Sequence, residues 1–156
     1  MLGFLEPIVS LTAVHFHYAG FSSARIFGML GSETRNSMLY PFPVVGVLAA
    51  TPLVALRITF SPLIEVAGSL LLAAAMPVLA WLLFQQSSPL LKIAASRLVA
   101  SMALACTYAV SEFASLHRIT IPTMVWSHGL LNAVGFATCA LLGLEPARHL
   151  TSLSSH

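Results

Sequence analysis

The stretch IPTMVWSHGLLNAVGFATCALLGL, residues 121–144, decides the fold of this chain. It contains no aspartate, glutamate, lysine or arginine, and most of its side chains are apolar. About 20 mostly apolar residues are enough for a helix to cross the hydrocarbon core of a bilayer. The stretch therefore predicts a transmembrane helix, and His128 and Asn132 are the polar groups that such a helix would carry into the membrane.

Working outward, the same pattern recurs through the chain. Only 8% of the 156 residues are charged, 58% are hydrophobic, and the mean hydropathy is +0.90, whereas a soluble domain is about 25% charged. Polar or proline-containing breaks separate the apolar runs, and prolines near their starts suit the first turn of a helix. We predict an all-α integral membrane bundle of about five transmembrane helices: Leu5–Met29, Pro41–Phe60, Pro62–Phe84, Pro89–Leu116 and Ile121–Leu144.

Composition excludes several classes of function. A net charge of +2, spread along the chain, is not the footprint of a nucleic-acid-binding protein. Cys106 and Cys139 lie inside apolar runs and form neither a disulfide framework nor a zinc motif. No redox-cofactor motif is present, so we expect no cofactor and assign no metal site.

The bundle is predicted to be one domain, residues 1–144, followed by a polar C-terminal tail, residues 145–156. The N-terminal run lacks the charged start and cleavage site of a signal peptide, so we expect it to be a retained helix. Cytoplasmic loops carry an excess of lysine and arginine. That rule places the N-terminus outside and the C-terminus inside, with four basic residues on the inner face against two on the outer: Arg25, Arg35, Lys92 and Arg148 against Arg57 and Arg118.

Charged and strongly polar side chains are costly inside a bilayer, so they mark candidate sites. Their spacing groups them by helix face at 100° per residue. Most of these polar side chains lie on one face of the fourth helix and one face of the fifth. The members are Arg97, Ser101, Tyr108 and Glu112 on the fourth helix, and Met124, His128, Asn132, Gly135 and Cys139 on the fifth.

The first and third helices add Glu65, His15, His17 and Tyr18. His15 and His17 are 200° apart on a regular helix, so only one can face a common site unless the helix is distorted there. Counting depth from the predicted helix ends, we expect Glu65, Glu112, His128 and His17 to share one level in the outer half of the bundle, with Tyr108 and Asn132 just below it. The alternatives are interhelical hydrogen bonding for Asn132, outward snorkelling for the glutamates, and inward snorkelling or an ion pair for Arg97.

Two motifs resemble the YndJ-like family of bacterial membrane proteins: LTAVHFHYAGF at residues 11–21 and MVWSHGLLNAVGFATCALLG at residues 124–143. The stretch SMALACTYAVSEF between them also fits that pattern. The resemblance implies a multi-pass protein of the bacterial plasma membrane, with no established activity to carry over. It further implies one signature made of His15, His17, Tyr18, Glu112, His128 and Asn132. Family members are longer, so missing helices would come from a partner or from a second copy in a homo-oligomer.

Three functions remain open. The first is a membrane enzyme (isomerase, cyclase or hydrolase, with epoxide opening as one such reaction) acting on a lipophilic small molecule. Burial would raise the pKa of its glutamates so that one can act as an acid. In this hypothesis Glu65, Glu112, His17 and His128 are catalytic, and the substrate-binding residues are His15, Tyr18, Tyr108, Asn132, Arg97 and Met124. The second is haem or metal binding through His17 and His128. The third is a non-catalytic carrier or assembly subunit.

Overall fold

The computed structural model of the chain describes residues 17–34, 38–56, 62–114 and 119–145. The described residues form helices joined by turns, and none of them lies in a β-strand. A π-helix, η1 (His17–Ser22), continues directly into α2 (Ser23–Thr34). Three further helices follow, and the last helix contains a second π-helical segment. Their bounds are α3 (Pro41–Leu56), α4 (Pro62–Phe84), α5 (Pro89–Phe113), α6 (Ile121–Leu130) and η2 (Leu131–Thr138), after which α-helix resumes to Glu145.

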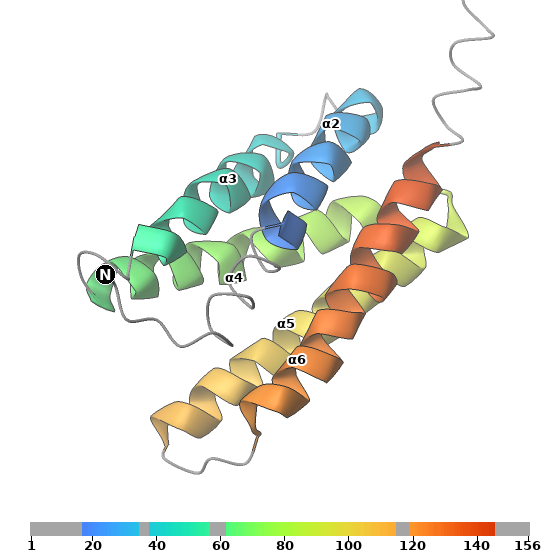
Figure 1. Cartoon of the computed structure of the whole chain (residues 1–156). Helices are drawn as coiled ribbons and strands as arrows, with labels where there is room; N and C mark the ends of the chain where they lie inside the picture. The colour runs from blue at the N-terminus through green and yellow to red at the C-terminus, as the bar shows by residue number, and fades with distance from the viewer. Residues whose placement is uncertain (1–16, 35–37, 57–61, 115–118, 146–156) are drawn as a thin grey trace, which may run out of the picture.

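The helices form two antiparallel pairs with α2 between them. In Figure 1, α3 lies along α4 and α6 lies along α5, and both pairings are among the main contacts of the fold. A short turn at residues 85–88 joins α4 to α5, and from that turn the two helices diverge. The η1 segment contacts both α3 and η2, so the start of the first helix bridges the two pairs.

These bounds agree with most of those predicted from sequence. The helices after the first begin at Pro41, Pro62, Pro89 and Ile121, as expected. The predicted first loop begins too early, because α2 continues to Thr34 instead of ending at Met29. Two hydroxyls bond to backbone carbonyls within this last part of α2: Ser32 donates to the carbonyl of Met29, and Thr34 to the carbonyl of Leu30. The start predicted for the first helix and the C-terminal tail beyond Glu145 lie outside the described residues.

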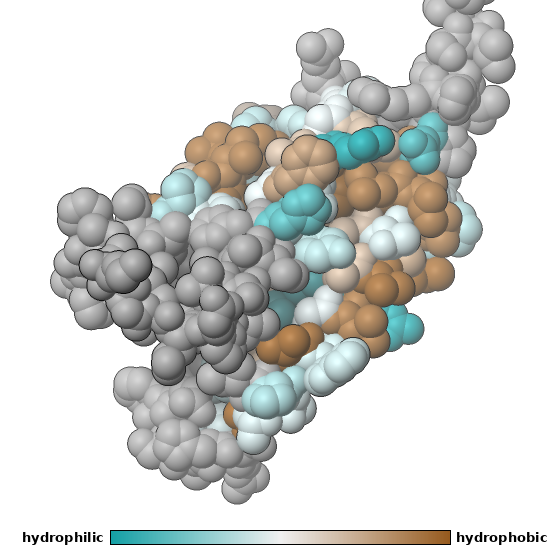
Figure 2. All heavy atoms as spheres, in the orientation of Figure 1, coloured by the Kyte–Doolittle hydropathy of each residue, from teal (hydrophilic) through white to brown (hydrophobic). Residues whose placement is uncertain are grey.

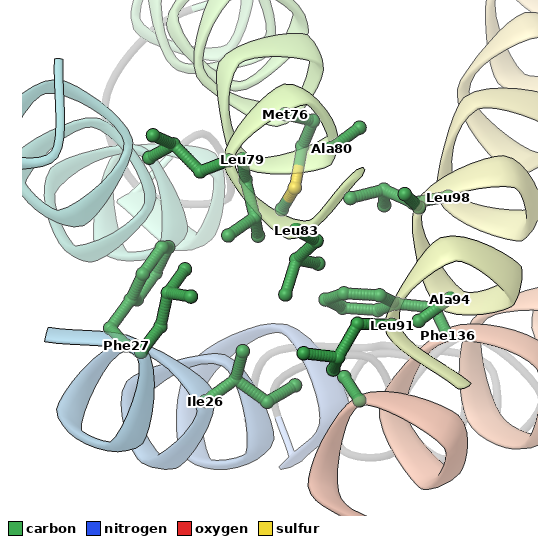
Figure 3. Packing of buried hydrophobic residues seen from close by; sticks show 14 of the residues in the cluster. Ile26, Phe27, Met76, Leu79, Ala80, Leu83, Leu91, Ala94, Leu98 and Phe136 are labelled. Atoms are coloured by element: carbon green, nitrogen blue, oxygen red, sulfur yellow. The ribbon is translucent and has the colours of Figure 1, made fainter. Parts of the chain in front are cut away.

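The hydrophobic core lies near the closed end of the bundle, where α4 turns into α5. Figure 3 shows Ile26 and Phe27 of α2 facing Leu83 of α4, with Leu91 of α5 and Phe136 of η2 beside them. These side chains are at most 4% exposed. Small residues let the backbones approach: a Cβ added to Gly46 of α3 would lie 2.7 Å from the Cβ of Ala75 in α4. Close packing of small residues is the usual source of helix association in membranes.

Much of the surface away from this core is apolar. Figure 2 shows brown side chains over a large part of the coloured surface. Large apolar residues on several helices are more than half exposed, among them Phe21, Leu70, Trp81, Val110, Trp126 and Val134. Two helical spans, Pro89–Tyr108 and Pro122–Glu145, are long and apolar enough to cross a membrane, whereas Pro41–Leu53 and Leu70–Phe84 are shorter apolar helices. The described residues thus form an all-α bundle of five helices with a lipid-compatible exterior.

Two stretches of the bundle are wound as π-helix instead of α-helix, which sequence patterns did not predict. Side-chain hydrogen bonds in the last helix follow this change. The hydroxyl of Ser127 in α6 donates to the carbonyl four residues back, that of Thr123. In η2 the hydroxyl of Thr138 reaches five residues back, to the carbonyl of Ala133, and the thiol of Cys139 reaches the carbonyl of Val134. Because π-turns are rare and concentrate at functional sites, they direct attention to η1 and η2.

Candidate functional site

A buried polar cluster joins α5 to the last helix. The Nδ1 atom of His128 lies 2.9 Å from the hydroxyl oxygen of Ser101 and 3.0 Å from the carbonyl oxygen of the same residue. The Nε2 atom lies 2.9 Å from the amide nitrogen of Asn132. Ser101 is fully buried, and His128 and Asn132 are half-buried. The imidazole is therefore held at both nitrogens.

The partners of His128 favour one of its two neutral tautomers. A backbone carbonyl oxygen can only accept a hydrogen bond, so Nδ1 must carry the proton that it donates to Ser101. The amide nitrogen of Asn132 is a donor, so Nε2 receives its proton through a lone pair. With the amide nitrogen of Asn132 toward Nε2, these contacts fit the tautomer that carries its proton on Nδ1 and its lone pair on Nε2. A carbonyl that orients Nδ1–H in this way is a common arrangement behind a histidine whose Nε2 acts as a base or ligand.

The contact between α5 and η2, called the α5–η2 seam below, continues one helical turn away from the cluster. A Cβ added to Gly135 would lie 3.0 Å from both Cβ and Cγ of Arg97 and 3.4 Å from its Cδ. The aliphatic stem of Arg97 therefore runs over the backbone of η2 where there is no side chain. Further along, a Cβ on Gly143 would lie 2.7 Å from Leu91.

These contacts confirm that the predicted polar faces of the fourth and fifth helices meet. Ser101 and Gly135 had been placed on those faces but not among the site residues. The spacing that aligned Ser101 with Arg97 was the signal that could have identified it. Tyr108 and Met124 are half-buried on α5 and α6, and their predicted contacts with substrate stay predictions.

The two glutamates lie near the helix ends where the sequence placed them, but Glu112 lies farther along α5 from the residue that contacts His128 than expected. Both lie in helices, Glu65 near the start of α4 and Glu112 near the end of α5, but their side chains lie outside the part that the structure describes. Eleven residues separate Glu112 from Ser101, about 16 Å along α5 at 1.5 Å per residue. Those ends of α4 and α5 also diverge in Figure 1. Counting depth from the helix ends predicts a short distance along the bundle axis between Glu112 and His128. The observed pairing of α5 with α6 gives a longer one. The catalytic roles of both glutamates stay predictions.

The first helix is distorted at the histidine motif. His15 lies outside the described residues, and His17 begins the π-helix η1. The exposed ring of His17 stacks on Phe21 at a centroid distance of 5.6 Å and meets Tyr18 edge-on at 5.6 Å. Among the described residues, no hydrogen bond or ring contact joins His17 or Tyr18 to His128. The chain is wound as a π-helix from His17 onward, and the 200° that separates His15 from His17 on a regular helix stays a prediction.

The described residues contain no group of three histidine, cysteine, aspartate or glutamate side chains placed to hold a metal ion. Both ring nitrogens of His128 already have protein partners, so a metal or haem iron would have to displace Asn132 to bind there. The chemistry that this cluster can offer directly is hydrogen bonding, and proton transfer at Nε2 once Asn132 moves aside.

The helical bundle, its apolar exterior and its intramembrane polar cluster define a polytopic α-helical membrane protein. The model of the family described as YndJ-like protein matches residues 1–136, and the chain belongs to that family. It is 33% identical over 143 residues to the uncharacterized membrane protein YndJ of Bacillus subtilis (strain 168), an alignment that covers 87% of this chain and 26% of the relative. The chain thus spans about a quarter of that relative's length. No solved structure matches it.

The two π-helices coincide with the two family motifs. The HxHYAGF motif ends in η1, HGxxNAxGF spans the junction of α6 with η2, and η1 contacts η2. The residues that carry the resemblance thus meet where the helices are wound unusually.

Proposed function

We propose that this chain is a membrane-embedded acid/base enzyme that isomerises, cyclises or hydrolyses a lipophilic small molecule, with epoxide opening as one candidate reaction. The observation that supports it best is the state of His128. Its Nδ1 lies 3.0 Å from a backbone carbonyl oxygen and its Nε2 lies 2.9 Å from the amide nitrogen of Asn132, and these contacts fit a proton on Nδ1 and a lone pair on Nε2. General bases in enzymes are commonly histidines oriented in this way.

In this proposal, His128 is the base and Asn132 is its movable partner. Rotation of the Asn132 side chain would expose Nε2 to a substrate, and the amide could then donate to a substrate oxygen. Tyr108 and Met124 would contact the apolar body of the substrate, and Arg97 its polar end. Glu65 and Glu112 are proposed as acids, with His15, His17 and Tyr18 supporting them from the first helix. Because about 16 Å along α5 separate Glu112 from Ser101, Glu112 would serve a different step from His128 unless the substrate is long.

The proposed setting is the bacterial plasma membrane, with the N-terminus outside and the C-terminus inside. The positions of Arg25 and Lys92, both exposed and both near the end of the bundle that holds Glu145, support this orientation under the positive-inside rule. The lipid bilayer and a lipophilic substrate are the proposed partners, and a homo-oligomer could supply helices that the longer relative contains.

Mass spectrometry of lipid extracts tests the proposal. The purified full chain in detergent, with no ion gradient, is incubated with a bacterial lipid extract beside a His128→Gln and a Glu112→Gln variant. We expect a compound to change structure without change of mass, or to gain one water, in the wild type and in neither variant. Ser127→Ala is the matched control, because that hydroxyl bonds only within its own helix.

Three results would favour another function. A product that differs by two hydrogens would indicate redox chemistry instead of acid/base chemistry. Movement of a compound across sealed vesicles, with no conversion in detergent, would support the carrier. Colour or stoichiometric metal in the purified protein would favour haem or metal binding, for which no observation on the described residues speaks at present.

A further inference from the structure

Arg97 is a charged residue inside a membrane-spanning helix. It belongs to the apolar span Pro89–Tyr108, which has a mean hydropathy of 1.5. It lies eight residues from the start of α5, about 12 Å along the axis. A guanidinium at this depth is costly unless it reaches the interface or a counter-charge. Its place within the span therefore requires an explanation.

The stem of Arg97 is held and its charge is presented outward. The Cβ, Cγ and Cδ atoms lie against Gly135, yet the residue as a whole is exposed. The stem thus runs along the seam between α5 and η2, and the exposed residue leaves its guanidinium free to reach the surface there. Contact of the stem with the backbone of η2 restricts its rotamers, which lowers the entropic cost of binding a ligand there.

The direction of the side chain also follows from the helix. Long side chains on an α-helix lean toward its N-terminus, which for α5 is the end at Pro89. Lys92 is exposed at that end, and Arg25 and Glu145 lie 3.9 Å apart across α2 and the last helix. Arg25–Glu145 is the ion pair between described residues, and Arg97 is not part of it. His128, one turn further along the seam, has an imidazole side chain, which carries no negative charge and so offers Arg97 no counter-charge.

We propose that Arg97 binds the anionic headgroup of an amphiphile, a phosphate or a carboxylate on an acyl chain, which enters from the bilayer at the α5–η2 seam. The planar guanidinium can bind either headgroup through two parallel hydrogen bonds. Leu104 and Tyr108 lie on the same face of α5 deeper in the membrane and are half-buried, so an acyl chain has apolar side chains to follow. This inference rests on the substrate contacts proposed above for Arg97 and Tyr108 and names the class of that ligand, but binding requires no reaction at His128 and is measured apart from turnover.

Native mass spectrometry of the full chain in detergent tests this binding. The probes are dioleoylphosphatidylglycerol, oleate and inorganic phosphate, with dioleoylphosphatidylcholine as the zwitterionic reference. We expect phosphatidylglycerol or oleate to bind more tightly than the reference. The stronger of the two identifies the source as a phospholipid or a fatty acid. Arg97→Gln should weaken that probe about tenfold or more, as the loss of a charge-assisted bidentate contact predicts.

Three variants separate a built site from general basic attraction. Lys92→Gln removes an exposed charge from the same helix away from Gly135 and should leave the affinity within twofold. Gly135→Ala keeps the charge but displaces the Arg97 stem and should weaken binding several-fold. Arg97→Lys keeps a charge without the planar fork and should bind less tightly than wild type, which preserves the test if Arg97→Gln does not fold.

Equal binding of phosphatidylglycerol to wild type, Arg97→Gln and Arg97→Lys would overturn the proposal. So would an equal loss in Lys92→Gln, because the attraction would then come from net charge alone. Tight binding of inorganic phosphate without any preference for an acyl chain would also overturn it, because the site would then recognise a soluble anion and not an amphiphile.

Discussion

The Nδ1 atom of His128 lies 3.0 Å from the carbonyl oxygen of Ser101, so two helices are joined through a backbone atom that no side-chain substitution removes. The hydroxyl of the same serine lies 2.9 Å from that nitrogen and reinforces the contact. Only a substitution of His128 removes both contacts. The imidazole is thus fixed by the path of α5 itself, which is a stricter constraint than a contact between two mobile side chains.

The tautomer of His128 is the first prediction. We expect the neutral ring to be protonated at Nδ1, because its partner there is a carbonyl. Long-range nitrogen–proton correlation spectra of the protein labelled with ¹⁵N-histidine distinguish the two tautomers, and His128→Gln identifies the signal. A ring protonated at Nε2 would mean that the amide of Asn132 is turned the other way, and the assignment of a basic Nε2 would be lost.

Removal of the Ser101 hydroxyl should cost little. In Ser101→Ala the carbonyl still accepts the proton of Nδ1, so we expect the free energy of unfolding to fall by about 0.6 kcal/mol, as interhelical hydrogen bonds in membranes average. His128→Ala removes both contacts and should cost more. Unfolding by dodecyl sulfate in mixed micelles measures both values. In Ser127→Ala, which removes a bond within α6, the position of α5 against α6 should be unchanged, and a larger effect there than in Ser101→Ala would contradict the interhelical role.

Two glycines should respond in opposite ways to alanine. At Gly46 the new methyl would lie 2.7 Å from the Cβ of Ala75, so the α3–α4 pair must separate, at a cost of about 1–3 kcal/mol. At Gly28 nothing lies within 4 Å, and alanine should stabilise α2 by about 0.5–1 kcal/mol through its better helix propensity. Thermal unfolding in detergent compares them. The double variant Gly46→Ala/Ala75→Gly should recover part of the loss, and no recovery would exclude the close helix contact as its cause.

Tyr40 predicts a loss of stability at alkaline pH. Its hydroxyl donates to the carbonyl of Phe27 at 2.6 Å, just before α3 begins, and burial raises the pKa of Tyr40 above 10.0. Because the folded state favours the protonated phenol, this contribution to stability is complete below pH 10 and is lost as the pH rises through the folded-state pKa. Tyr40→Phe should cost about 1 kcal/mol at pH 7. The cost should shrink above pH 10, and a cost that is independent of pH would show that Tyr40 does not titrate with folding.

The sequence predicted the helices well because residues at the helix ends themselves determine where each helix begins. Proline cannot donate a backbone hydrogen bond, so Pro41, Pro62 and Pro89 mark helix starts in the structure as they do in the pattern. The faces of α5 and the last helix were also predictable, since a helical period and a few polar residues define them. Contacts of Ser101 with His128 and of Arg97 with Gly135 bear out that spacing.

The level of the site was harder to predict, for two physical reasons. Depth counted from helix ends assumes that neighbouring helices run level with each other, whereas α4 and α5 diverge from their turn. It also assumes one rise per residue. In η2 the hydrogen bonds span five residues instead of four, and the run of leucine, asparagine, alanine, valine and glycine there carries no local signal for a wider turn. The π-winding and the exact partner of His128 therefore come from packing between helices, which a single sequence does not display.

The wide turns of η2 make the number of residues in that segment as consequential as their identity. Deleting one residue between Leu131 and Thr138 would let the segment relax to an α-helix, and because a π-turn closes over one more residue than an α-turn, the following turn would keep nearly its orientation. Gly143 would then stay close to its position against Leu91, whereas the same deletion in a regular α-helix would rotate the following turn by about 100°. Relatives that lack one residue within that segment should therefore keep the packing at the end of the last helix, with an ordinary α-helix in place of the wide turns.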